Sequence, residues 1–328
     1  MKKKLNYFLV FLWLGIVTST ACDVCNIYDY TGRQNKTFVG IFYRYRVMNG
    51  YSHIHPEVHK FVINDPNART AHDIEGTGFY HHKTNKDFQT YHVVDLRFNY
   101  ALKDKINIGC IVPMLFNKAH YAEIYYDTKP VSDSTVHTMG LGDVLIFSDY
   151  VFSWERDDKK AFVKPGFALK VPTGNDNLGA NGMRYPHEIQ TGTGSIDFLL
   201  RLNANVRRHN LGAEWLSSYR INTVHDNYKF GNSFNATLNP YYVVDLNDNL
   251  SIVPKIGTYA EIFTADRQGP TKRTDTGGNT WYGNVGLDVL YGNFIVQTLF
   301  QKPLIDKLQG QQLGNAGRVV VGLVYNIY

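Results

Sequence analysis

The sequence predicts a transmembrane, all-β, up-and-down antiparallel barrel of about twelve strands, preceded by a cleaved signal peptide. Three observations predict this fold. An export signal opens the chain, long segments of alternating apolar and polar residues follow, and the connections between these segments are long and short in turn. A helical period of 3.6 residues persists nowhere after residue 21, so strands are the expected building elements.

Residues 1–21 have the three parts of a secretory signal. Lys2, Lys3 and Lys4 form a basic start, and an apolar core, broken only by Asn6 and Gly15, runs from Leu5 to Val17. Small residues then precede Cys22, as a cleavage site requires. The core is too short for a transmembrane anchor. We therefore expect export, and a mature chain that begins near Cys22.

Composition excludes several classes of protein. The 328 residues include 19 Phe and 23 Tyr, too many aromatic side chains for a disordered chain. The formal charge of +5 arises largely in the signal, which holds three of the 34 basic residues and none of the 29 acidic ones. The mature chain is therefore nearly neutral, and nucleic acid is not an expected partner.

The segment 22–36 is expected to be a periplasmic N-terminal extension that carries a CxxC motif. Three interpretations of this motif stay open. Cys22 and Cys25 could form a disulfide in an oxidising compartment, Cys22 could carry a lipid, or the pair could contribute to a metal site with two further ligands.

Residues 37–328 are expected to form the barrel. Twelve segments of about 10 to 16 residues alternate with period two, which is longer than typical globular strands and matches tilted membrane-spanning strands. These segments are 37–48, 88–102, 105–117, 139–153, 160–173, 191–206, 210–223, 232–246, 249–263, 280–290, 294–303 and 316–328.

Alternation alone cannot separate a soluble sandwich from a barrel, but the connections can. Short turns, such as 103–104 and 247–248, follow every second strand, and longer connections of 8 to 39 residues lie between them. Tight turns at one rim and long loops at the other are typical of outer-membrane barrels. A closed barrel also leaves no unpaired strand edge in the hydrocarbon. The longest connection, 49–87, is expected to be extracellular.

Three short motifs resemble a known family. They are Met139-Gly140-Leu141-Gly142-Asp143-Val144, the segment from Lys164 to Asn175 that contains Val171-Pro172-Thr173-Gly174, and Thr191-Gly192-Thr193-Gly194-Ser195-Ile196-Asp197. In this order they are similar to a family of outer-membrane transporters named after the MetA pathway of phenol degradation. The resemblance covers about residues 88–328. It implies a barrel that passes small, often aromatic or hydrophobic, solutes, and it supplies no catalytic residues.

We therefore expect a channel or transporter in the outer membrane of a Gram-negative bacterium. Its partners would be the lipid bilayer, small-molecule solutes and the barrel-assembly machinery, and no cofactor is expected. Charged residues on the polar faces of the strands are the candidates for lining the lumen, where they would select solutes by charge. They are Asp95, Arg97, Asp197, Arg201, Glu214, Arg220, Lys255, Glu261 and Asp288.

Other functions are open to test. Six of the 12 histidines fall in 49–87, and His53, His55 and His59 could capture a metal ion, because alternate residues of an extended chain share one side. The same charges could instead pair across strands and make a purely structural barrel. An outer-membrane lipase is disfavoured, because Ser52, His53 and Ser233 form no recognisable nucleophile motif. We therefore do not expect an enzyme.

Overall fold

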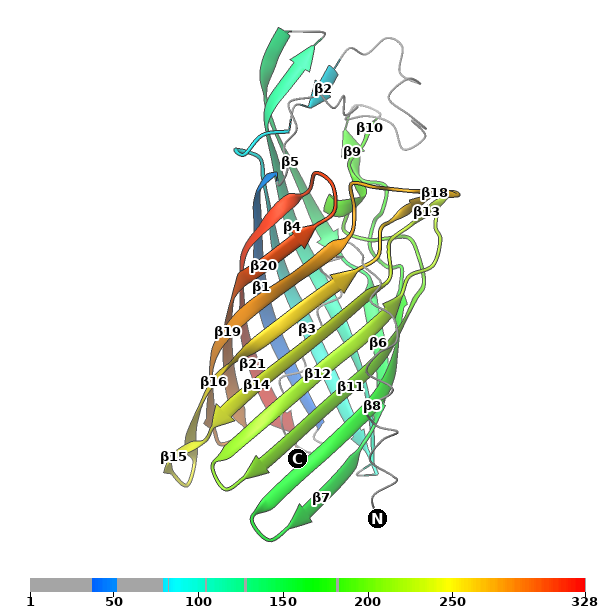
Figure 1. Ribbon diagram of the computed structural model, residues 1–328. Coiled ribbons are helices and arrows are strands. Elements are labelled where there is room, and N and C mark those ends of the chain that lie inside the picture. The colour runs from blue at the N-terminus through cyan, green and yellow to red at the C-terminus, as the bar shows by residue number, and fades with distance from the viewer. Residues whose placement is uncertain are drawn as a thin grey trace, which may run out of the picture.

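The computed structural model describes residues 37–51, 79–81, 83–103, 105–126, 129–180 and 183–327. Over these residues, twelve antiparallel strands close into a barrel, which confirms the predicted fold class (Figure 1). The predicted signal and the 22–36 segment lie outside the described residues. A search of the described residues finds no helix that is both long enough and apolar enough to cross a membrane.

Most barrel strands are single elements, whereas two are interrupted and carry more than one label. In chain order the barrel strands are β1 (Thr37–Tyr51), β3 (Phe88–Leu102), β4 (Ile106–Tyr126), β5 (Lys129–Leu141) continued by β6 (Val144–Tyr150) and β7 (Phe152–Arg156), β8 (Lys159–Val171), β11 (Asp197–Arg208), β12 (Leu211–Ile221), β14 (Ser233–Tyr242) continued by β15 (Val244–Asn247), β16 (Leu250–Phe263), β19 (Gly278–Tyr291), β20 (Phe294–Leu308) and β21 (Leu313–Ile327).

Several short elements lie at the end of the barrel that carries the long connections. They are β2 (Phe79–His81), β9 (Gly179–Ala180), β10 (Met183–Arg184), the 3₁₀ helix η3 (His187–Ile189), β13 (Tyr228–Lys229), β17 (Arg267–Gln268) and β18 (Thr271–Lys272). We call this end the long-loop end and the opposite one the short-turn end.

The first and last strands close the barrel. Thr37 of β1 lies opposite Ile327 of β21, and their pairing continues up to Tyr51 opposite Leu313. Every other barrel strand pairs with its neighbours along the chain, so the circuit has no free edge. In a membrane this closure satisfies the backbone N–H and C=O groups that no water can reach. β1 begins and β21 ends at the short-turn end (Figure 1).

The apolar face of each strand points outward, as the sequence predicts. Leu96 and Phe98 on β3 are 44% and 45% exposed, and Leu200 on β11 is 55% exposed. Asp95 and Arg97, which alternate with them, are buried. A soluble sandwich would show the opposite arrangement, with its apolar residues inside. The exposed apolar belt therefore identifies the outer surface as the one that faces lipid.

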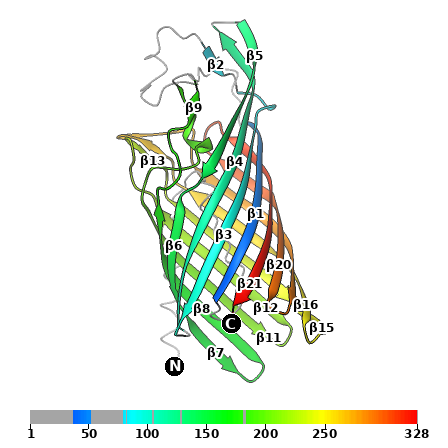
Figure 2. The ribbon, with the colours of Figure 1, turned by 180° about the vertical axis from the view of Figure 1, so that it is seen from behind.

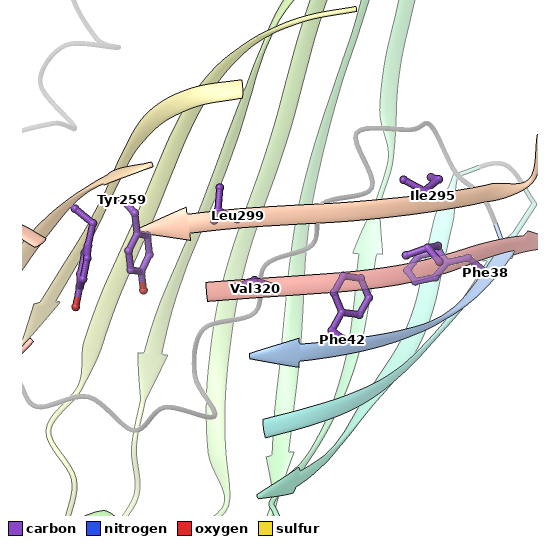
Figure 3. Packing of buried hydrophobic residues seen from close by; sticks show 8 residues of the cluster. Phe38, Phe42, Tyr259, Ile295, Leu299 and Val320 are labelled. Atoms are coloured by element: carbon purple, nitrogen blue, oxygen red, sulfur yellow. The ribbon is translucent and has the colours of Figure 1, made fainter. Parts of the chain in front are cut away.

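Apolar residues also line part of the inner wall. Phe38 and Phe42 on β1 pack with Tyr259, Leu299 and other residues of β16, β19, β20 and β21 into one buried cluster (Figure 3). A second cluster, which includes Phe147 and Leu199, lies on β4, β6, β8 and β11. The interior of the barrel is thus partly apolar, although period-two alternation alone predicts only polar residues there.

Two segments differ from the sequence-based expectation. Residues 118–138, expected as a loop, are mostly strand: β4 and β5 pair well beyond the barrel wall and form a hairpin above it (Figure 2). Residues 191–196, expected to open a strand, instead precede β11, which begins at Asp197. Gly192 is in close backbone contact with Gly174, and Gly194 has a left-handed φ of +70°; both suit a turn better than a strand.

Candidate functional site

The interior of the barrel is the candidate site, because it gathers most of the buried charge. The nine residues predicted to line the lumen all lie on inward faces, and each exposes at most 7% of its surface. That they select solutes stays a prediction. Most of these nine residues belong to one of four ion-pair clusters in the structure. Each cluster brings together residues of different strands, and the sequence alone did not predict that these residues meet.

The first cluster places one carboxylate between two arginines. Asp95 accepts hydrogen bonds from Arg44 Nε at 2.8 Å and from Arg97 Nη2 at 2.9 Å. The Arg97 guanidinium also lies over the Phe42 ring, 4.0 Å from its centroid. This cluster is positive overall, and it sits on β1 and β3. Such buried, charge-assisted contacts fix side chains more firmly than exposed ones.

The second cluster gathers all three glycine-rich motifs. Lys170 Nζ lies 2.8 Å from Asp143 and 2.7 Å from Asp197, and the three side chains are almost fully buried. Thr193 donates to Asp143 through its amide at 3.0 Å and its hydroxyl at 2.7 Å. Ser195 donates to Asp197 at 2.9 Å. Each charge therefore has partners, and the motifs are explained as one buried structural unit.

Two features of the motifs allow this cluster to form. The pairing of β4 with β5 and then β6 shifts by one residue at Gly142 and Asp143, so the wall carries a bulge there that turns Asp143 inward. Gly174 and Gly192 touch each other through their backbones, and a Cβ on Gly174 would lie 2.7 Å from the Gly192 Cα. Only glycine fits at this crossing.

The third cluster places one lysine between two carboxylates. Lys255 Nζ lies 2.6 Å from Asp288 and 3.7 Å from Glu214. Asn239 donates to Glu214 at 2.8 Å and accepts from Asn284 at 3.0 Å, which extends the network along the wall. The cluster joins β12, β14, β16 and β19 and is negative overall.

The fourth cluster joins strands that are not neighbours, through the interior of the barrel. Arg318 on β21 binds both oxygens of Glu261 on β16, each at 2.5 Å, although two strands separate β16 from β21. Arg46 on β1 approaches the same carboxylate at 3.9 Å from the far side of β21. Tyr259 donates to Glu261 at 2.6 Å. We call this group the cross-barrel bridge, because it narrows the interior at the level of Glu261.

The two remaining predicted residues lie near these clusters. Arg201 on β11 approaches Asp149 at 3.7 Å, and its guanidinium covers the Phe147 ring at 4.2 Å. Arg220 on β12 is 1% exposed and lies inside the barrel. Positive charge is thus present on both the β1–β3 side and the β11–β12 side of the interior.

A loop folds into the long-loop end of the barrel. Its 3₁₀ helix, η3, buries Ile189 against β4 and β5, where Asn117 of β4 and Thr138 of β5 donate to the Ile189 carbonyl at 3.2 and 2.5 Å. On its other side the His187 ring stacks on Tyr228, with a centroid distance of 4.0 Å. The loop therefore links the β4–β5 wall to the short strand β13 at the mouth. Period-two alternation gives no signal for such a loop.

Acid should loosen this loop. Burial, together with the nearby Arg184 and Arg273, lowers the pKa of His187 from 6.5 to about 4. The docked loop holds the imidazole neutral, so its stability is full above pH 6.5 and is lost as the pH falls from there towards 4. We expect hydrogen exchange in residues 184–192, corrected for intrinsic rate, to accelerate roughly tenfold between pH 6.5 and 5.

The His187→Gln variant is the control for this effect, because glutamine does not titrate. Its corrected exchange in the same peptide should lack the acceleration that protonation of His187 causes. Equal pH profiles in the wild type and in His187→Gln would contradict the assignment to His187.

The predicted metal and disulfide residues cannot be compared with the structure. His53, His55 and His59, and the Cys22 and Cys25 pair, lie outside the described residues. Among described residues, Asp176, His225 and Asp226 bring three possible ligand atoms within 4.8 Å of one another. Arg184 already approaches both carboxylates, at 3.2 and 3.8 Å, and so supplies positive charge where a metal ion would. We regard this group as an ion-pair network.

Ser233, one of the residues weighed for a lipase, is buried on the inner face of β14. Hydrolysis of membrane lipids would need the hydroxyl at the lipid-facing rim, so this position does not fit that activity. Ser52 and His53 lie outside the described residues.

Sequence reasoning missed several charged residues of these clusters. Arg44, Arg46 and Arg318 alternate with outward apolar residues on β1 and β21, so period two would have found them. Lys170 and Asp143 stand inside the quoted motifs, but only the fold shows that they touch. Asp149 on β6 also alternates with outward residues, so period two would have found it as well.

The fold is similar to those of solved outer-membrane proteins. An outer membrane channel from Pseudomonas putida F1 aligns with a TM-score of 0.57 over 92% of this chain and 99% of that chain, at 14% identity. The transport unit of the autotransporter AIDA-I from Escherichia coli gives 0.48 over 92% and 94%, at 10% identity. A Pseudomonas aeruginosa FadL homologue gives 0.39 over 90% and 91%, at 11% identity. No family model matches the chain, and no curated protein is a significant match.

An identity of 14% with the Pseudomonas putida channel supports a shared fold, but it does not show a shared activity. The closed circuit, the apolar belt and the charged interior together define the class: this is a transmembrane β-barrel of the outer-membrane type.

Proposed function

We propose that this protein is an outer-membrane channel of a Gram-negative bacterium that passes small solutes with aromatic or other apolar groups. The lining of the interior is the observation that carries the proposal. Arginines lie over aromatic rings at three places inside the barrel: Arg97 over Phe42, Arg201 over Phe147 and Arg318 over Tyr282. Ring faces and guanidinium groups together form a surface to which a small aromatic anion is complementary.

Size and fold support the same proposal. Twelve strands give an interior between the filled eight-stranded barrels and the open porins, and the cross-barrel bridge narrows it further. The similarity to an outer membrane channel agrees with this function at the level of fold. The proposal has three further parts. Residues 1–21 direct export, the barrel-assembly machinery inserts the chain, and the protein is a member of the phenol-degradation transporter family.

Planar-bilayer recordings of the purified protein test it. We expect discrete current steps, because a passage through the barrel conducts ions. Replacing Arg201 and Arg220 together by glutamine removes two interior positive charges, so the cation-to-anion permeability ratio should rise about twofold. Benzoate should reduce the current more than acetate does at equal concentration, because only benzoate can stack on the ring faces.

Lys302→Gln is the matched control for these recordings. Lys302 points outward from β20, so its loss removes one positive charge without touching the interior. Absence of current, or a permeability ratio that Arg201 and Arg220 do not affect, would contradict transport and favour a barrel whose interior charges are only structural.

A further inference from the structure

A basic and aromatic patch lies on the outer surface near the long-loop end, on β1, β3, β4 and β5, strands that lie side by side in Figure 2. Its members are His92, Lys118, His120 and His137, together with Phe88 and Tyr43. We call it the β3–β5 patch. It has no part in the ion-pair clusters of the interior, and the channel function does not require it.

The register of the strands brings these residues together. Lys118 lies directly opposite His137 across β4 and β5, and Phe88 lies opposite His120 across β3 and β4. His92 on β3 is offset by two from the partner of Lys118, which places the two residues about 7–8 Å apart. His120 follows Lys118 by two residues on β4, so it lies on the same face. The Phe88 ring stacks on His120 at 5.0 Å and lies 5.1 Å from Lys118 Nζ.

The patch faces away from the interior. Asn117 and Ala119, which alternate with Lys118 and His120, are buried, so the two basic side chains point outward. None of the four basic residues forms an ion pair with another described residue. The Tyr43 hydroxyl lies 2.7 Å from His92 Nδ1. A hydroxyl that donates to Nδ1 leaves the proton on Nε2, where it can serve an external acceptor.

The height of the patch matches one boundary of the membrane. A tilted strand crosses the hydrocarbon in about 9–11 residues. His92 lies ten residues before Leu102, the short-turn end of β3, and Lys118 lies twelve residues after Ile106, where β4 begins. At comparable positions on β11 and β19 the outward residues are aromatic: Phe198 and Trp281. The patch is therefore not part of a basic belt that runs around the whole barrel.

We infer that the β3–β5 patch binds the phosphorylated headgroup of an anionic lipid in the outer leaflet. Lys118 supplies a charge, the three imidazoles supply N–H donors, and phosphate oxygens accept from both. Below the patch, Leu96 and Phe98 offer an apolar surface to the acyl chains of the same lipid. A soluble phosphate would gain nothing from that surface. The inference rests on the proposed placement in the outer membrane, but not on conduction.

Native mass spectrometry of the purified barrel in detergent tests the inference. The probe is a glucosamine-based lipid with two phosphates, compared with the same lipid after removal of the phosphates. We expect the phosphorylated lipid to bind about tenfold more tightly. The variant with His92, Lys118, His120 and His137 all changed to glutamine should bind both lipids equally. Lys118→Gln alone should weaken binding of the phosphorylated lipid about fivefold.

Lys302→Gln, on β20 and outside the patch, should bind like the wild type. A heat-shift on gel electrophoresis checks that every variant is folded. Equal binding of both lipids by the wild type would overturn the inference, as would undiminished preference in the quadruple variant. Displacement of the lipid by millimolar inorganic phosphate would also overturn it, because the site would then recognise phosphate alone. Bilayer recordings on the quadruple variant should be unchanged, so a failure of conduction and a failure of lipid binding are distinguishable.

Discussion

Replacing Glu261 by glutamine should destabilise the barrel by about 3–5 kcal/mol, because the change leaves buried guanidinium groups without their counter-charge. In the structure Arg318 makes a bidentate contact with Glu261, and Arg46 approaches the same carboxylate. The loss should appear as a lower free energy of unfolding in urea titrations of the barrel reconstituted in vesicles. Since the bridge also crosses the interior, single-channel conductance should rise in the folded fraction.

Two variants make this prediction specific. Glu155→Gln breaks an ion pair with Lys160 of similar length, 2.5 Å, in which both side chains are more than half exposed, so it should cost less than about 1 kcal/mol. The double variant Glu261→Gln with Arg318→Gln should recover part of the loss, because it also removes one of the unpaired charges. A loss for Glu261→Gln no larger than that for Glu155→Gln would refute the energetic role of the bridge.

Lys170→Met should have an effect of similar size, about 3–5 kcal/mol, for the opposite electrostatic reason. Methionine would leave the carboxylates of Asp143 and Asp197 buried side by side with no cation between them. The hydrogen bonds from Thr193 and Ser195 compensate only partly, because neutral donors do not balance two negative charges. Urea unfolding of the reconstituted barrel is again the measurement.

Lys160→Met is the matched control for Lys170→Met, since it makes the same substitution on the same strand. The Lys160 side chain is 61% exposed, so its loss should change the unfolding free energy by less than about 1 kcal/mol. If the two lysine variants unfold at the same urea concentration, buried charge pairing is not what holds the three motifs together.

The outcome for the motifs shows where sequence reasoning ends. The glycines at 142, 174 and 192 are visible as a pattern, and they belong to the motifs that resemble a barrel family. These glycines are needed because segments that are distant in sequence touch each other. Gly174 and Gly192 are 18 residues apart, and Asp143 and Thr193 are further apart. No periodicity within one strand encodes such a contact. The mouth loop around η3 escaped prediction for the same reason.

The sequence by itself determined the strand count, the outward and inward faces, and the inward position of all nine predicted charges, because alternation follows directly from the geometry of a strand. The tertiary structure decided which charges meet. Glu261 and Arg318 lie 57 residues apart in sequence and on strands that are not neighbours, and the curvature of the closed wall brings them to 2.5 Å. Closure depends on the stagger of all twelve strands together, and that is a property no single segment carries.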